Sequence, residues 1–178
     1  MTQYRRNRVA GGTYFFTVVA AHRANGPLVE HIADLRAAFR LVIDEHPFEI
    51  EAIVILPDHL HALWTLPQGD ADYATRWKKI KTNFSKRLPR NEPRESRSAS
   101  RTAKGERGIW QRRYWEHTIR DDDDFGAHCD YIHFNPVKHG YARVVGDWPH
   151  STFRQYVDRG VYPMDWGGSE GDGGDFGE

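Results

Sequence analysis

The pattern of apolar and polar positions predicts four strands and three helices in the order β-α-β-β-α-β-α. β-Branched and aromatic residues, set between turn residues, predict strands at Tyr14–Ala20, Phe48–Leu56, His59–Leu66 and Ile109–Arg120. Apolar residues at three- and four-residue steps predict helices at Glu30–His46 and Asp72–Leu88, and a third helix follows the last strand and runs to Pro136. This order predicts an α+β, ferredoxin-like fold, a split β-α-β layout in which an antiparallel four-stranded sheet carries helices on one face.

The length of 178 residues accommodates one domain with appendages, which we place at residues 1–166. Residues 89–108 have almost no large apolar side chain and alternate arginine with Ser, Glu and Pro, which predicts a mobile basic loop. Such a loop could drape over a bound strand or be a tolerated insertion. Residues 167–178 are rich in Gly, Asp and Glu, which predicts a disordered acidic tail.

The composition favours a cytoplasmic protein. The sequence has no apolar run long enough to cross a membrane, and its polar, arginine-bearing start lacks a signal-peptide pattern. The single cysteine, Cys129, leaves no internal disulfide and suits a reducing compartment. We expect Cys129 to be a small packed residue rather than a nucleophile.

Charge is distributed unevenly along the chain, although the formal net charge is zero. Residues 164–178 hold five acids and no bases, so residues 1–163 carry 25 basic and 20 acidic residues, a net charge of +5. Residues 76–113 hold 14 Lys and Arg against three acids, a net charge of +11. This excess predicts a polyanionic partner, of which nucleic acid is the commonest, although a solvated basic face has the same pattern.

Two histidines, His59 and His61, lie one residue apart in the apolar stretch V-I-L-P-D-H-L-H-A-L-W. Side chains alternate along a strand, so both imidazoles would project from one face, with Leu60 and Ala62 on the other. Two imidazoles on a rigid strand make half of a divalent-metal site. Alone, the pair is equally consistent with two unrelated polar residues on a half-buried strand.

A second group of candidate residues lies in the last predicted helix. Tyr131 and Asn135 are four residues apart and share a helix face, which can lie across the sheet and face His59 and His61. Asn135 would then be a third metal ligand through its amide oxygen, and Tyr131 would stand beside the metal. A phenol has a pKa of about 10, so it attacks phosphorus only when its proton is removed. Taken alone, Tyr131 is better interpreted as an ordinary core aromatic.

Four acids, Asp121–Asp124, precede the same helix. A metal-binding cluster is one interpretation, but acids at a helix start bind the unpaired N–H groups and complement the helix dipole, which is the interpretation we favour. Gly140 is the expected C-terminal cap of this region.

Four stretches resemble the REP-associated tyrosine transposases, relatives of the small single-tyrosine insertion-sequence transposases. They are Y-R-R at residues 4–6 with G-G-T-Y-F-F at 11–16, H-L-H at 59–61, W-Q-R-R-Y-W-E-H at 110–117 and Y-I-H-F-N-P-V-K-H-G at 131–140. The resemblance implies the His-hydrophobic-His (HUH) endonuclease fold, with His59, His61 and Asn135 as metal ligands and Tyr131 as nucleophile. Related insertion-sequence transposases have glutamine at the position of Asn135.

The resemblance also implies a substrate and a partner: single-stranded DNA that carries hairpins of repetitive extragenic palindromes (REP). Candidate DNA-binding residues, chosen for their charge, are Arg5, Arg6, Lys78, Lys79, Lys81, Lys86, Arg87, Arg112 and Arg113. Because the ligand set lacks a thiolate, we expect Mg²⁺ or Mn²⁺ as the cofactor.

These inferences predict a metal-dependent endonuclease and strand transferase that forms a covalent 5′-phosphotyrosine. One alternative is a REP-hairpin binding protein without catalysis, against which all four active-site residues argue. Another is a small zinc metallohydrolase, which would leave the cations and Tyr131 unexplained. We expect a monomer, although insertion-sequence relatives form domain-swapped dimers.

Overall fold

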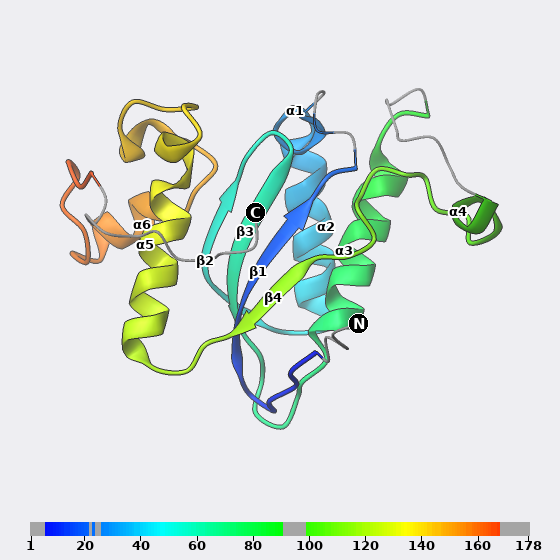
Figure 1. Ribbon diagram of the computed structural model, residues 1–178, viewed down its shortest axis with the longest axis horizontal. Coiled ribbons are helices and arrows are strands. Elements are labelled where there is room, and N and C mark those ends of the chain that lie inside the picture. Colours follow the sequence, from blue (N-terminus) through cyan, green and yellow to red (C-terminus); the bar gives the residue numbers. More distant parts are fainter. Residues whose placement is uncertain (1–5, 22, 24–25, 91–98, 168–178) are drawn as a thin grey trace, which may run out of the picture.

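A four-stranded antiparallel sheet in the order β2-β3-β1-β4 forms the centre of the protein (Figure 1). The computed structural model describes residues 6–21, 23, 26–90 and 99–167. Its strand order is that of the predicted ferredoxin-like fold, so this prediction is confirmed. In chain order the elements are β1 (Thr13–Val19), α1 (Pro27–Glu30), α2 (Ile32–Glu45), β2 (Glu49–Ile55), β3 (His59–Thr65), α3 (Tyr73–Arg87), α4 (Ala99–Ala103), β4 (Trp115–Thr118), α5 (Asp122–Lys138), η2 (Val145–Asp147) and α6 (Phe153–Asp158).

Helices cover both faces of this sheet. The helices that connect its strands, α2 and α3, pack together on one face as predicted, and α5 lies on the other with α6 beside it (Figure 1). Side chains of β3 point alternately to the two faces of the sheet, and Leu60, Ala62 and Trp64 join the core under α2 and α3. The histidines His59 and His61 project to the opposite face, as the sequence predicts.

Aromatic side chains dominate the core between the sheet and its connecting helices. Trp64 of β3 stacks on Trp77 of α3 with ring centroids 4.2 Å apart, and the ring of Phe48 packs on Trp64 at a centroid distance of 4.2 Å. The predicted apolar stripe of α3 is buried, and Asp72 caps the helix by accepting a hydrogen bond from the N–H of Thr75 at 3.0 Å. This core anchors the sheet on which the histidine pair is placed.

The predicted last strand, Ile109–Arg120, is too long: β4 covers Trp115–Thr118, and Trp110 forms only an isolated bridge with Ala20. In a continuous strand Arg112 would share the inward face of Trp110 and Tyr114. The chain instead leaves the sheet, and Nε of Arg112 reaches Oε2 of Glu106 at 3.0 Å near the surface. The guanidinium of Arg112 thus stays at the surface, where burial would cost free energy.

Two other boundaries differ from prediction. The helix α5 continues through Pro136 to Lys138 rather than ending at the proline. The segment 89–108 is not a structureless loop throughout, because residues 99–103 form α4 and Arg107 donates to the carbonyls of Ser85, Leu88 and Pro89. These carbonyls lie at the C-terminal end of α3, where helix carbonyls lack intrahelical donors.

Some predictions fall on residues that the structure does not describe. Arg5, residues 91–98 of the predicted loop and residues 168–178 of the predicted tail lie outside the described part of the chain. Within the described part, no helix combines the length and the apolar composition required to span a membrane. Cys129 is buried, as predicted.

Candidate active site

The histidine pair of β3 presents two buried imidazoles side by side to α5. The ring centroids of His59 and His61 are 5.0 Å apart. Nδ1 of His61 lies 2.9 Å from Oγ1 of Thr17, its cross-strand neighbour on β1, and Nδ1 of His59 lies 2.8 Å from Oδ1 of Asp58. Both rings are therefore oriented through Nδ1, so Nε2 is the nitrogen that can ligate a metal.

Asp58 holds His59 in a carboxylate–histidine pair. Burial tends to raise the pKa of Asp58, but the hydrogen bond with His59 and the charges of His59 and Arg23 lower it below its usual range. Nε of Arg23 lies 3.0 Å from Oδ2 of Asp58, which orients the carboxylate. Nε2 of His59 is buried and has no hydrogen-bond partner in the described residues, which fits a metal-ligating nitrogen.

A stripe of α5 faces the histidine pair at i, i+4 and i+8. The Tyr131 ring lies 5.1 Å from the His61 ring, and the His139 ring lies 5.1 Å from the His59 ring. Asn135 is halfway between Tyr131 and His139 on this stripe and is fully buried. The structure therefore places Tyr131 against His61 and His139 against His59, with Asn135 between them on the same side of the helix.

Lys138 is a site residue that the sequence analysis missed. Its ammonium nitrogen lies 4.8 Å from the centre of the Tyr131 ring. Lys138 follows Tyr131 by seven residues, two helical turns, and this spacing was the available signal. The predicted helix end at Pro136 hid it, because residues beyond the helix would not share the stripe.

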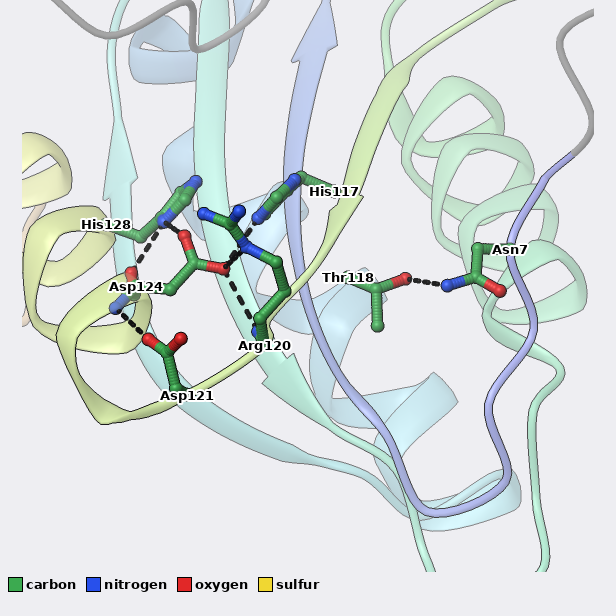
Figure 2. A network of polar contacts seen from close by, with 7 residues as sticks. All are labelled: Asn7, His117, Thr118, Arg120, Asp121, Asp124 and His128. Atoms are coloured by element: carbon green, nitrogen blue, oxygen red, sulfur yellow. Dashed lines mark hydrogen bonds and ion pairs between the residues drawn. The ribbon is translucent and has the colours of Figure 1, made fainter.

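A polar network joins β4 to the first turns of α5 (Figure 2). Asp121 caps the helix by accepting a hydrogen bond from the N–H of Asp124 at 2.8 Å, which matches the predicted role of the acidic run. Oδ2 of Asp124 lies 2.8 Å from Nε2 of His117 and accepts hydrogen bonds from N and Nε of Arg120, both at 3.0 Å. Nδ1 of His128 donates to the carbonyl oxygen of Asp124 at 2.7 Å. These bonds fix the start of the helix that carries Tyr131.

The same network contains a second set of possible metal ligands. Donor atoms of His117, Asp124 and His128 all lie within 4.8 Å of one another. Burial opposes ionisation of Asp124, but its hydrogen bonds with Arg120 and His117 hold the pKa of this carboxyl far below its usual range. Because the Arg120 guanidinium already supplies the positive charge at this carboxylate, the network fits a structural role better than a metal site.

A basic cleft of about 780 Å³ lies between α3, α4 and residues 105–114. Its lining includes seven Lys and Arg side chains besides Arg6, namely Lys78, Lys81, Lys86, Arg101, Lys104, Arg107 and Arg112. The predicted DNA-binding residues Lys79, Arg87 and Arg113 lie outside this lining, and Lys79 pairs with Glu45 at 2.7 Å.

Two predicted DNA-binding residues are already engaged at the mouth of this basic cleft. Nζ of Lys81 donates to the carbonyl of Gln111 at 2.9 Å, and burial lowers the pKa of Lys81 to about 8. The Arg6 guanidinium lies 4.3 Å from the centre of the Tyr114 ring and donates to its hydroxyl at 2.6 Å. The sequence analysis did not single out Arg101, Lys104 and Arg107, because they fall in the segment predicted to be mobile.

Comparisons with known proteins identify the family of this chain. Residues 9–135 match the family model described as IS200-like transposase. The chain is 48% identical to a Haemophilus influenzae protein and 45% identical to an Escherichia coli protein, and both are named as REP-associated tyrosine transposases. The alignments cover 95% of this chain and 95% of the former protein, and 94% and 92% for the latter.

A solved structure supports the same assignment. The chain is similar to a REP-associated tyrosine transposase bound to a REP hairpin, with a TM-score of 0.81, 45% identity and coverage of 97% of this chain and 94% of that one. The chain therefore belongs to the IS200-like transposase family and, within it, to the REP-associated tyrosine transposases.

Proposed function

We propose that this chain is a metal-dependent DNA endonuclease and strand transferase that uses Tyr131 as its nucleophile. The observation that carries the proposal is the place of the Tyr131 ring, which packs at the edge of the apolar core on the α5 side and lies 5.1 Å from the ring of His61, one of a pair of buried imidazoles. A phenol next to possible metal ligands is placed for nucleophilic attack on a phosphodiester.

In the cleavage step, Oη of Tyr131 forms a bond to phosphorus and the bond from phosphorus to the 3′ oxygen breaks. The phenol gives its proton to solvent and the departing 3′ oxygen takes one up. The products are a 5′-phosphotyrosine and a free 3′-hydroxyl, and attack by a 3′-hydroxyl on the phosphotyrosine rejoins a strand without ATP. The Lys138 ammonium lies 4.8 Å from the ring centre, so its positive charge would favour the ionised form of the phenol.

His59, His61 and Asn135 would hold a divalent cation through two imidazole nitrogens and one amide oxygen. When bound, such an ion polarises a non-bridging phosphate oxygen and offsets its developing charge. We infer Mg²⁺ or Mn²⁺, because the set contains no thiolate. The carboxylate of Asp58 keeps His59 in the tautomer whose Nε2 faces the site.

The inferred substrate is single-stranded DNA that carries a REP-type hairpin, the ligand in the similar solved structure. The basic cleft supports this inference, since its seven cations and Arg6 face a single acid, Glu106, among the lining residues. Cations so arranged bind phosphates of any sequence and steer DNA to the protein. We assign the hairpin duplex to this cleft and the strand to be cut to the face under α5.

Covalent capture tests the proposal directly. Wild-type protein, Mn²⁺ and a hairpin oligonucleotide labelled on the 3′ side of the cleavage site should give a labelled protein band that survives denaturation. The Tyr131→Phe variant should bind the hairpin and form no such band. Hairpin binding without an adduct or cleavage by the wild-type protein would instead identify a binding protein, whereas cleavage without an adduct would indicate a metal-activated water.

A further inference from the structure

A ladder of aromatic rings leads away from His59 along the segment that follows α5. It runs through His139, Tyr141, Trp148 and His150. The centroid distances are 5.1 Å from His59 to His139, then 6.3 Å, 5.7 Å and 5.6 Å for the successive pairs. The ladder therefore begins at a proposed metal ligand and reaches the half-buried ring of His150, just before α6. We call its first three rings after His59, those of His139, Tyr141 and Trp148, the aromatic shelf.

The shelf has a fixed base and an exposed edge. Nε1 of Trp148 donates to the carbonyl of Ile55 at 3.0 Å, which fixes the indole to β2. Tyr141 is 43% exposed and its backbone N–H donates to the carbonyl of Pro136 at 2.8 Å. Gly140 permits this return of the chain, because its φ of 73° is a conformation that favours glycine. The turn thus places Tyr141 over the end of α5.

Core packing does not account for this arrangement. A tyrosine that leaves 43% of its surface in water contributes less to the core than the fully buried rings under α2 and α3. The His139 and Tyr141 rings lie within 29° of parallel, the arrangement of stacked rings. The exposed cations Lys138 and Arg143 flank the shelf. Residues 138–150 contain one acidic residue, Asp147.

We propose that the aromatic shelf binds unpaired nucleobases of the strand on which Tyr131 acts, next to the phosphate that is cut. Every base has a π-face, so stacking on such rings holds single-stranded DNA of any sequence. The flanking cations suit the adjoining phosphates. The contact of His139 with His59 makes the shelf continuous with the proposed metal site. The shelf would therefore bind the single strand near Tyr131, whereas the basic cleft would bind the hairpin duplex. This inference rests on the proposed function, because it places the bound strand across the same site.

Fluorescence of 2-aminopurine provides the test, with the base analogue placed in turn at each unpaired position that flanks a REP-type hairpin. Metal is omitted so that no cleavage occurs. Wild-type protein should quench at least one flanking position, and Tyr141→Leu should abolish that quenching and weaken flanked-hairpin binding by about 5-fold to 150-fold, the range for one stacked base. Tyr141→Phe, which keeps the ring, should behave as wild type.

Controls separate the shelf from the fold and from the chemistry. Val144→Ala changes another exposed side chain of the same segment and should alter neither signal. Binding of a hairpin without flanks should be unaffected by Tyr141→Leu. Equal quenching and equal affinity for wild type and Tyr141→Leu at every flanking position would contradict the proposal that the shelf binds bases. If wild-type protein quenches the base yet never forms a covalent adduct when metal is added, the shelf stands and the proposed chemistry fails.

Discussion

The two faces of the sheet are made by the same strands but hold different kinds of side chain. The face under α2 and α3 buries a continuous apolar and aromatic core. Of the ten buried polar or charged side chains in the described residues, eight lie on the α5 side; they are Thr17, His59, His61, Asp124, His128, His133, Asn135 and Thr152. Burying polar groups contributes little net stability, and each needs a partner. Both faces therefore bury apolar side chains that stabilise the fold, and the α5 face also holds the polar groups of the candidate site.

On the α5 face, directional contacts accompany a second, smaller apolar core. Nε2 of His133 lies 3.0 Å from Oγ1 of Thr152, which ties α5 to the segment before α6. Burial lowers the pKa of His133 to about 4, so this imidazole is neutral near pH 7. Hydrogen bonds of this kind set the position of a helix more narrowly than apolar contacts do, which would suit the proposed nucleophile Tyr131 on that helix.

Replacing the proposed nucleophile, Tyr131, should have the largest effect on activity and little effect on stability. Tyr131→Phe keeps the ring that packs on His61, so the free energy of unfolding should change by no more than about 1 kcal/mol. Cleavage should fall by a factor on the order of 10⁴ or more, since a covalent nucleophile is removed. Single-turnover cleavage and denaturant unfolding measure the two quantities. Residual cleavage near the wild-type rate would show that the α5 face does not hold the nucleophile.

Removing the metal should separate activity from stability in the same way. Chelation by EDTA should stop cleavage and leave the melting temperature nearly unchanged, because the core under α2 and α3 contains no proposed ligand. Mg²⁺ or Mn²⁺ should restore cleavage. Unfolding on chelation, or rescue by Zn²⁺ alone, would instead indicate a structural or zinc-hydrolase site.

A substitution in the core under α2 and α3 should lower stability and leave the cleavage rate nearly unchanged. Trp64 is fully buried and stacked on Trp77, so Trp64→Ala should lower the free energy of unfolding by about 3–5 kcal/mol. At a temperature where the variant remains folded, its cleavage rate should stay within a few-fold of wild type. The larger residue in Trp64→Phe provides a graded control, with a smaller loss of stability. A selective loss of cleavage by a fully folded Trp64→Ala would show that the two faces are coupled.

The network at the start of α5 should show a pH-dependent effect of intermediate size. Asp124→Asn should destabilise the fold at neutral pH by about 1–3 kcal/mol, the value of hydrogen bonds to a charged group. The pKa of Asp124 is lowered in the folded state, so its stabilisation is complete above the unfolded pKa of about 4 and declines as the pH falls below it. Unfolding of wild type and variant from pH 7 to pH 2 should show curves that converge. A constant difference would mean that Asp124 acts through packing rather than charge.

The sequence was sufficient to predict the face that carries the site. The period of two in β3 puts His59 and His61 opposite Leu60 and Ala62, and this alternation cannot change without exposing the core. The four-residue spacing of Tyr131 and Asn135 is equally rigid, because a helix returns to the same face after one turn. Local periodicity thus predicted which side chains of β3 and of α5 share a face.

Features that depend on tertiary contacts were not predictable in this way. The helix passes Pro136, and this extension brings Lys138 over Tyr131. Docking of Arg107 on the carbonyls at the end of α3 shows that part of a segment poor in apolar residues is ordered by hydrogen bonds, which leave no periodic pattern. His117 and Asp124 likewise meet only because β4 ends beside α5.

The smallest expected effect concerns the basic cleft. Its lining includes some of the predicted DNA-binding residues and excludes others. A variant that changes three cleft residues to Gln, Lys78, Lys86 and Lys104, should flatten the slope of log affinity against log salt by roughly 0.7 to 0.9 for each lost phosphate contact. Lys79, Arg87 and Arg113, all outside the cleft lining, provide a matched triple Gln control that should change the slope much less. Cleavage at saturating DNA should be the same in both variants, because neither touches Tyr131 or its neighbours. The measurement is hairpin affinity across a salt series. Equal slopes for the two triple variants would mean that DNA binding depends on the overall charge of this face rather than on the cleft.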